Sequence, residues 1–342
     1  MVCMIPRTTL ACQSEDSELP KWQATLAGAF REPSDLLDYL NLPKSLLNSA
    51  ITASDSFSLR APLSYCQRIE KGNPNDPLLR QILPLGAELI ETPDFNSDPV
   101  GDLAAMEVPG LLHKYHGRVL IITTAACAVH CRYCFRRHFP YQENKIEQNW
   151  QEAVDYIREN SDIHEVILSG GDPLNLSESK LRNLSDKLLP IPHIKTLRIH
   201  TRQPIVLPER INTDFLMWVD SLPWKIVMVL HCNHANEIDH AVSAALKQLQ
   251  QHQVTLLNQS VLLAGVNDTA DTLIKLSEKL FENHILPYYL HQLDKVQGAG
   301  HFAVTDDKAS QLLNEIRQRL PGYLVPKLVK EKAGKASKTA II

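Results

Sequence analysis

Three closely spaced cysteines give the strongest chemical signal in the sequence. Cys127, Cys131 and Cys134 form a C-x3-C-x2-C pattern in the segment CAVHCRYC. Thiolates held this close together on one loop bind a soft metal ion or an iron–sulfur cluster. A [4Fe–4S] cluster with three protein thiolates leaves one iron open, and an open position can bind a substrate or cofactor, as in other catalytic metal sites. The pattern therefore predicts a cluster that performs chemistry.

A zinc site is the main alternative, although the triplet lacks the fourth ligand that structural zinc requires. His130 or His138 could supply it, and the segment HCNHANE at 231–237, with Cys232, offers further donors. Such a chain would be a zinc-stabilised binding protein. It would have no need for the glycine motif and the ordered strand–helix units described below. Metal analysis of the purified protein separates the two hypotheses. Iron together with sulfide would indicate the enzyme, whereas zinc in a colourless protein would indicate the binding protein.

A glycine motif follows the next apolar run. The run EVILSG at 165–170 leads into SGGDPL, which contains Ser169, Gly170, Gly171 and Asp172. Paired glycines after a strand let a ligand approach the backbone closely. A plain turn is the alternative for such a motif standing alone. Its position after the second strand of the same array favours a cofactor site.

The elements that must position these motifs alternate along the chain. Short apolar runs predict strands, and amphipathic stretches between them predict helices. The strands are expected at 119–124, 165–170, 196–201, 225–230, 254–263 and 286–293, and helices at 149–160, 179–189 and 237–252. From the second run onward the strands recur at roughly 30-residue intervals, the length of a βαβ unit. Continuous apolar runs are typical of parallel strands buried on both faces.

This alternation predicts an α/β fold, a partial (β/α)6 barrel of the TIM type, because a full eight-unit barrel needs about 250 residues. An open doubly wound sheet is the alternative that the same pattern permits. We expect a mainly helical N-terminal extension at 1–105, with helices at 34–42 and within 71–84. The barrel core is expected at 106–300 and a C-terminal segment at 301–342.

Composition argues against several other classes of protein. Of the 342 residues, 44% are hydrophobic and 22% are charged, and the formal net charge of -4 gives no reason to expect binding to nucleic acid or anionic membranes. No apolar run reaches the roughly 18 residues of a transmembrane helix, and the N-terminus lacks the apolar core of a signal peptide. An odd number of cysteines, seven, at irregular spacing argues against a disulfide framework. We therefore expect a cytoplasmic protein.

Beyond these patterns, the sequence resembles the radical S-adenosylmethionine superfamily, through the cysteine triplet with Tyr133 and through SGGDPL. About residues 105–342 are similar to one branch of it, the lysine 2,3-aminomutases. The matching segments also include CRYCFRRHF (131–139), RIHTRQPIVLPERI (198–211), NHANEI (233–238), LLNQSVLLAGVND (256–268) and PYYLHQLDKVQGAGHF (287–302). The resemblance implies an isomerase that moves the α-amino group of lysine to the β-carbon. It also implies three cofactors: a [4Fe–4S] cluster, S-adenosyl-L-methionine and pyridoxal 5′-phosphate.

The resemblance assigns roles to residues that would bind lysine and pyridoxal phosphate. Lys338, in KAGKASKTA, matches the lysine that holds pyridoxal phosphate, with Lys335 as the competing candidate and a flexible basic tail as the alternative. Arg136 matches the partner of the substrate carboxylate, a task that suits a guanidinium. Asp294 and Glu331 match two aspartates that pair with the substrate ε-ammonium.

The remaining implied assignments concern the cofactors. The three cysteines hold the cluster, and the backbone of the SGGD segment at 169–172 meets the amino group of S-adenosylmethionine. Gln259 matches a residue that lines the adenosyl site, and Arg118 a basic residue near pyridoxal phosphate. Arg202, directly after a predicted strand, either meets a cofactor or forms a salt bridge to a neighbouring helix.

A narrower resemblance concerns the product. The compact length and the segments KGNPNDPLLRQ and CRYCFRRHFPY are similar to the branch of this family that makes (R)-β-lysine from L-lysine for elongation factor P. It implies a functional link to elongation factor P and to the ligase that attaches β-lysine to it. A homodimer is also expected. Glu331 is one methylene longer than the aspartate of the family, so a radical enzyme acting on a different amino acid is the alternative.

Overall fold

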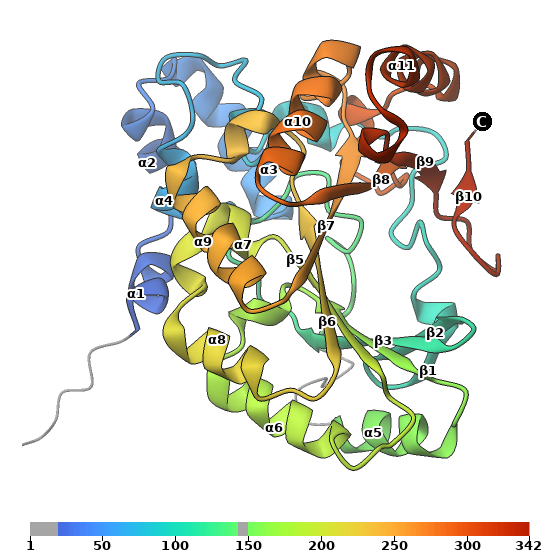
Figure 1. The fold of residues 1–342 in the computed structure, drawn as a ribbon. Coiled ribbons are helices and arrows are strands. Elements are labelled where there is room, and N and C mark those ends of the chain that lie inside the picture. The colour runs from blue at the N-terminus through green and yellow to red at the C-terminus, as the bar shows by residue number, and fades with distance from the viewer. Residues whose placement is uncertain (1–19, 143–149, 342) are drawn as a thin grey trace, which may run out of the picture.

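The computed structural model describes residues 20–142 and 150–341, and a single curved sheet organises it (Figure 1). The N-terminal stretch with Cys3 and Cys12, where no signal peptide is expected, lies outside the described residues. The sheet of the described residues has ten strands, each paired with its neighbours in the sequence. They are β1 (Met106–Val108), β2 (Leu111–Tyr115), β3 (Arg118–Thr124), β4 (Glu165–Gly170), β5 (Thr196–Thr201), β6 (Lys225–His231), β7 (Thr255–Leu262), β8 (Leu286–Gln292), β9 (Lys327–Lys330) and β10 (Thr339–Ala340).

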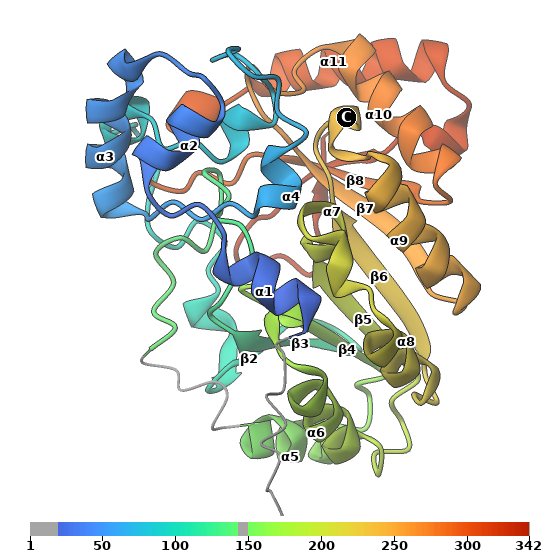
Figure 2. The same ribbon diagram turned by 90° about the vertical axis from the view of Figure 1, so that its left-hand side faces the viewer.

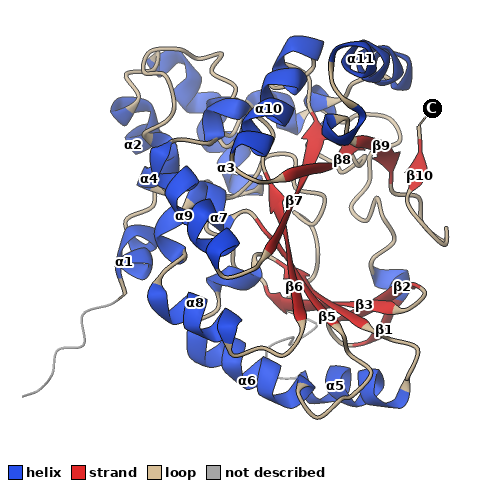
Figure 3. Ribbon diagram, viewed as in Figure 1, coloured by secondary structure: helices blue, strands red, loops and turns tan. Residues whose placement is uncertain are grey.

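The strands from β3 to β9 run parallel, and helices connect them across the outer face of the sheet (Figure 3). These helices are α5 (Trp150–Glu159), α6 (Glu178–Leu188), α7 (Gln203–Val206), α8 (Thr213–Asp220), α9 (His240–Gln251), α10 (Ala270–Glu282) and α11 (Asp306–Arg319). Strand order follows chain order throughout, whereas a doubly wound sheet reverses its order at a switch point. The prediction of a partial (β/α)6 barrel is confirmed, and the doubly wound alternative is wrong.

Local sequence explains where the outer helices form. Trp150, Ala153, Val154 and Ile157 of α5 recur at helical spacing and are buried. Several outer helices begin at a side chain that accepts a main-chain N–H bond, as a good N-cap does. These N-caps are Ser177 for α6, Asn212 for α8, Asp239 for α9, Thr269 for α10 and Thr305 for α11. Each of the three helices predicted from amphipathic spacing is present, although position 149 lies outside the described residues.

Burial differs from one parallel strand to another. β4 is buried through four consecutive residues, as expected for a strand covered on both faces. In β7 the buried residues alternate with half-buried ones such as Leu257, Gln259 and Val261. The expectation of continuous burial is therefore wrong for β7, because its inner face borders a cavity.

The N-terminal helices form a layer beside the barrel (Figure 2). They are α1 (Lys21–Ala27), α2 (Pro33–Tyr39), α3 (Leu47–Ser56) and α4 (Leu63–Cys66). The helix predicted at 34–42 is α2, which ends earlier because Asn41 adopts a positive φ of 55°. The short helix expected within 71–84 is a single 3-10 turn, Leu79–Gln81. Apolar residues of this layer share a core with Ala128 and Val129 of the cysteine loop.

The C-terminal segment is ordered by strand pairing. β10 pairs antiparallel with β9, with Thr339 opposite Lys330, and Ile341 packs against the core between α10 and α11. The alternative of a flexible tail is therefore wrong through position 341. The pairing brings the two ends of the intervening loop together, which places Glu331 beside Lys338. Of the helices described, none combines the length and apolar character needed to cross a lipid bilayer.

Candidate active site

A cavity of about 510 Å³ opens at the carboxyl ends of the parallel strands. Its size suits a small-molecule site, and this end of a β/α barrel is where catalytic residues gather. All the residues predicted to bind substrate or cofactors line it, although they are spread along the chain from position 118 to position 338. They are Cys127, Cys131, Cys134, Arg118, Arg136, Ser169, Gly170, Gly171, Asp172, Gln259, Asp294, Glu331 and Lys338. Lys335, the competing candidate for Lys338, is exposed and does not line the cavity.

The three cysteines lie on the loop that follows β3, and all three are free thiols. Burial, together with the neighbouring cysteines, raises the pKa of Cys127 well above its usual value and that of Cys134 to about 11. At neutral pH these two thiols keep their protons, whereas bound iron would displace them. Three soft donors on the wall of one cavity therefore fit a cluster that leaves an iron open toward a ligand.

The described residues give the zinc alternative no support. His138, one of the two histidines proposed as the fourth ligand, has its Nε2 3.2 Å from the carbonyl oxygen of Gln297. The ring of His130 stacks on Phe57 and its Nδ1 lies 2.9 Å from the Ser58 carbonyl oxygen. The Cys232 thiol donates to the His234 carbonyl oxygen at 3.4 Å, so the HCNHANE segment is used within the fold.

The glycine motif packs directly against the start of the cysteine loop. Gly170 has a φ of 122°, a region that favours glycine. A Cβ on Gly171 would lie 2.5 Å from the carbonyl oxygen of Ala126. The N–H groups of Gly171 and Asp172 donate to the carbonyl oxygens of Thr124 and Ala126, at 2.7 and 2.8 Å. The two glycines are thus required for the two motifs to meet.

Asp172 joins the glycine motif to the next strand. Its carboxylate accepts bonds from Thr201 Oγ1 at 2.7 Å, the Arg202 N–H at 2.8 Å and the Leu174 N–H at 3.0 Å. Burial raises the pKa of Asp172 to about 6 even though these bonds favour the ionised form. Its side chain is therefore engaged in the fold, although the sequence grouped it with the cofactor-binding residues.

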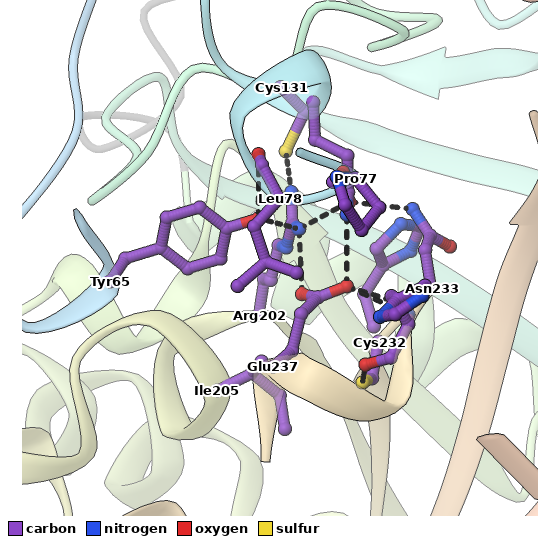
Figure 4. A network of polar contacts seen from close by, with 12 residues as sticks. Tyr65, Pro77, Leu78, Cys131, Arg202, Ile205, Cys232, Asn233 and Glu237 are labelled. Atoms are coloured by element: carbon purple, nitrogen blue, oxygen red, sulfur yellow. Dashed lines mark hydrogen bonds and ion pairs between the residues drawn. The ribbon is translucent and has the colours of Figure 1, made fainter. Parts of the chain in front are cut away.

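Arg202 lies in a buried polar network behind the cluster loop (Figure 4). Its Nη1 donates to Cys131 Sγ at 2.9 Å. Its Nη2 donates to Glu237 Oε2 at 2.8 Å and Gln81 Oε1 at 2.7 Å, and lies 3.4 Å from the Tyr65 hydroxyl. The salt bridge to a neighbouring helix is therefore confirmed, since Glu237 belongs to the 3-10 helix Ala235–Glu237. Contact between Arg202 and a cofactor stays a prediction.

A chain of alternating charges runs from Arg136 to Lys338. Arg136 Nε donates to Asp102 Oδ2 at 2.6 Å, and Asp102 Oδ1 lies 2.7 Å from Lys114 Nζ. Lys114 Nζ lies 3.2 Å from Glu331 Oε1, and Glu331 Oε2 accepts from Lys338 Nζ at 2.6 Å. Burial alone would raise the pKa values of Asp102 and Glu331, but these cations hold both below their usual range. The carboxylates therefore stay ionised.

Asp294 stands outside this chain. Among the described residues, no basic side chain forms an ion pair with its carboxylate. Burial and the negative charge of Glu331 raise the pKa of Asp294 to about 7, while Lys338 acts in the opposite direction. The site thus holds a carboxyl group that would be stabilised as an anion by an incoming ammonium group.

The wall around Lys338 includes aromatic rings and neutral imidazoles. Lys338 Nζ lies 5.7 Å from the centre of the Tyr289 ring. Burial lowers the pKa of His231 to about 3 and those of His200 and His291 well below their usual value, so these imidazoles are neutral. Arg118 Nε is a buried donor without a partner among the described residues, and an anionic ligand would satisfy it.

Several residues of the cavity carry no signal that identifies them in the sequence. Lys114 belongs to the short strand β2, and Asp102 lies in a loop before it. Tyr289 and His291 alternate on β8, a strand that was predicted without assigning roles to its side chains. For Tyr289 and His291, the sequence offers one indication: the run 286–293, predicted as a buried strand, contains several side chains with polar groups.

Comparison with known proteins agrees with this geometry. The family model described as Radical SAM superfamily matches residues 121–213. The chain is 48% identical over 323 residues to an L-lysine 2,3-aminomutase of Haemophilus influenzae, which covers 94% of this chain and 96% of that protein. It is also 48% identical to one of Escherichia coli, covering 94% of both chains. A relative of the same name from Clostridium subterminale is 32% identical to this chain. The match covers 96% of this chain and 79% of that protein.

Proposed function

Because this chain belongs to the L-lysine 2,3-aminomutase family of radical S-adenosylmethionine enzymes, we propose that it converts L-lysine to (R)-β-lysine with pyridoxal 5′-phosphate bound at Lys338. The family makes the enzyme an isomerase and implies a [4Fe–4S] cluster and S-adenosyl-L-methionine. Cys127, Cys131 and Cys134 would hold the cluster, which would supply the electron for reductive cleavage of S-adenosylmethionine.

The observation that carries the lysine proposal is the charge pattern of the cavity. A diamino acid presents a carboxylate at one end and a distal ammonium at the other. Arg136, oriented by Asp102, offers a guanidinium that suits bidentate binding of the carboxylate. Asp294, which lacks a cation, suits the ε-ammonium. Glu331 would add negative charge on that side, although Lys114 and Lys338 already neutralise it.

The surroundings of Lys338 fit pyridoxal phosphate. Arg118 has an unsatisfied buried Nε for a phosphate, and its guanidinium lies 5.1 Å from the centre of the Tyr115 ring. When bound, pyridoxal phosphate supplies a π-system that lets nitrogen pass between adjacent carbons. Glu331 Oε2, 2.6 Å from Lys338 Nζ, would orient this amine toward the cofactor.

The other groups would position S-adenosylmethionine and exclude water. The glycine motif would meet its methionine part, where Gly170 and Gly171 leave the backbone uncovered, and Gln259 would line the adenosyl part. Apolar side chains such as Val261 and Leu293 also line the cavity and limit access of water to a radical.

We also propose that the product serves elongation factor P, with a ligase attaching (R)-β-lysine to it. Support comes from the segments KGNPNDPLLRQ and CRYCFRRHFPY, which resemble that branch. A cytoplasmic location follows, since cluster thiolates and the free Cys66 and Cys232 suit a reducing compartment. Mass analysis of elongation factor P, incubated with this enzyme, lysine and the ligase, tests the link.

The central experiment uses anaerobically purified protein reconstituted with iron and sulfide. It receives dithionite, S-adenosylmethionine, pyridoxal phosphate and L-lysine, and chromatography detects β-lysine. We expect β-lysine from the unmodified enzyme and none from Cys131→Ala or Lys338→Ala. Borohydride should fix pyridoxal phosphate to the unmodified protein and to Lys335→Ala, whose side chain lies outside the cavity, but not to Lys338→Ala.

Two other results would change the conclusion. Formation of 5′-deoxyadenosine without β-lysine would keep the radical enzyme and replace lysine by another amino acid. Borohydride labelling of Lys338→Ala but not of Lys335→Ala would move the cofactor to Lys335.

A further inference from the structure

Arg202 connects the three parts of the site that surround the cluster. It follows β5, and its main-chain N–H is held by the Asp172 carboxylate of the glycine motif at 2.8 Å. Its side chain, only 6% exposed, extends to Cys131 in the cysteine loop and to Glu237 in the 3-10 helix Ala235–Glu237 (Figure 4). The main chain and the guanidinium of Arg202 are therefore both held by buried hydrogen bonds.

The bonds fix which atom of Arg202 faces the sulfur. Glu237 and Gln81 both accept from Nη2, which leaves Nη1 directed at Cys131 Sγ. Gln81 is held in turn, since its amide nitrogen donates to Glu237 Oε1 at 3.2 Å. Asn233 closes the network by donating from its main chain to Glu237 Oε1 at 2.9 Å. A residue needed only for packing would not require this precise arrangement of donors.

We propose that Arg202 is a positioning residue that acts through Cys131 and raises the reduction potential of the cluster. One-electron reduction makes a thiolate-bound cluster more negative. A buried cation that donates a hydrogen bond to a ligand sulfur therefore stabilises the reduced cluster more than the oxidised one. The inference rests on the cluster alone, so it does not depend on lysine or pyridoxal phosphate.

Glu237 sets the strength of this effect. Its carboxylate is fully buried, 2.8 Å from Arg202 Nη2, and partly neutralises the guanidinium. Removing the cation and removing its counter-charge should therefore move the potential in opposite directions. A general disturbance of the fold would move it the same way in both variants.

The test is an EPR-monitored redox titration of reconstituted protein, with dithionite as reductant and without lysine or pyridoxal phosphate. For Arg202→Gln we expect the ratio of reduced to oxidised cluster at a fixed potential to fall about tenfold, a negative shift of about 59 mV. Arg202→Lys keeps a charge but cannot reach both partners, and should lie between. Glu237→Gln keeps the shape of the side chain and should shift the potential upward.

Arg210→Gln serves as a matched control. Arg210 is also a buried arginine with an acidic partner, Glu178 at 2.9 Å, and its hydrogen bonds within the described residues go to Leu174, Leu176 and Glu178 and not to a cysteine. Its variant should retain the unmodified potential. An unchanged potential in Arg202→Gln with full iron and sulfide content would overturn the proposal, as would shifts of equal sign in Arg202→Gln and Glu237→Gln. If Arg202→Gln does not bind iron, Arg202→Lys and Glu237→Gln decide by the same criterion.

Discussion

At the scale of single residues, the cavity is organised by how its charges are paired. The carboxylates of Asp102 and Glu331 each contact two cations, so their negative charges are largely neutralised by side chains of the protein. Asp294 has no such partner among the described residues, and its pKa is raised to about 7. The protein thus keeps one carboxyl group whose ionisation depends on what enters the cavity.

This imbalance predicts a pH dependence of substrate binding. Because the pKa of Asp294 is raised, the group is an anion above about pH 7 and becomes neutral below it, where it can no longer attract an ammonium. We expect kcat/KM for lysine to fall by up to about tenfold per pH unit below that value. Initial rates between about pH 6 and pH 9 at constant ionic strength measure it.

Asp294→Asn is the matched variant for this prediction. It keeps the size of the side chain but removes the charge. The fall in kcat/KM should therefore correspond to a loss of about 3–5 kcal/mol of transition-state stabilisation. Its profile should also lose the acidic limb assigned to Asp294. If that limb persists unchanged in Asp294→Asn, another group controls the pH dependence.

The sequence could predict much of this site but not its pairing. The cysteine triplet and the SGGDPL motif are local patterns, so their spacing alone identifies them. Lys338 and Asp294 carry no local pattern and were predicted only by resemblance. Asp102 and Lys114 escaped prediction because their role is an ion pair formed across separate segments, which no local spacing reveals.

At the scale of elements, the contact between the glycine motif and the cysteine loop has almost no free space. A Cβ on Gly171 would lie 2.5 to 2.8 Å from backbone atoms of Ala125 and Ala126, which cannot move away as a side chain can. Gly171→Ala should therefore push the two loops apart, cost about 1–3 kcal/mol of unfolding free energy and lower the iron content. Anaerobic urea denaturation and iron analysis measure both quantities.

Gly322→Ala is the control for this change. A Cβ at Gly322 would meet no atom within 4 Å, so stability and iron content should stay close to those of the unmodified protein. A Gly171→Ala protein as stable and as rich in iron as Gly322→Ala would show that the contact tolerates a methyl group.

The β9–β10 pair holds Lys338 in place through residues that follow it. Ile341 packs against the apolar core between α10 and α11, and its N–H donates to the Leu328 carbonyl oxygen at 3.0 Å. A charge at this position would detach the end of the hairpin. We expect Ile341→Asp to weaken pyridoxal phosphate binding about tenfold, which corresponds to one or two lost hydrogen bonds, while iron content is unchanged.

Borohydride fixation at increasing pyridoxal phosphate concentration gives the affinity, with the exposed Ala340→Ser as control. Equal affinities in the two variants would show that β10 does not support Lys338.

The central strands were predictable because their apolar runs are long and recur at the length of a βαβ unit. β1, β2, β9 and β10 were not predicted. They have two to five residues and form through pairing with their neighbours, and all but β10 contain charged side chains such as Lys114 and Lys330. In such short strands, tertiary pairing outweighs the local pattern.

At the scale of the whole molecule, the N-terminal layer and the barrel are joined at the cluster loop. Both oxygens of Glu88 accept from Arg132, at 2.8 and 2.7 Å, and one also accepts from Arg137 at 2.9 Å. These three side chains are at most 1% exposed. Since the two arginines flank Cys134, the layer beside the barrel is part of what shapes the cysteine loop.

Glu88→Gln tests this connection, because it removes the carboxylate charge that Arg132 and Arg137 share in the described structure. Removing one charged partner of a buried ion pair costs about 3–5 kcal/mol of stability, so the free energy of unfolding should fall by that amount. Iron content should fall with it, since the arginines lose the partner that fixes the loop around Cys134. Glu91→Gln, three positions along and exposed, should change stability by less than about 0.5 kcal/mol. If Glu88→Gln has the same free energy of unfolding and the same iron content as Glu91→Gln, the N-terminal layer lies beside the barrel without supporting the cluster loop.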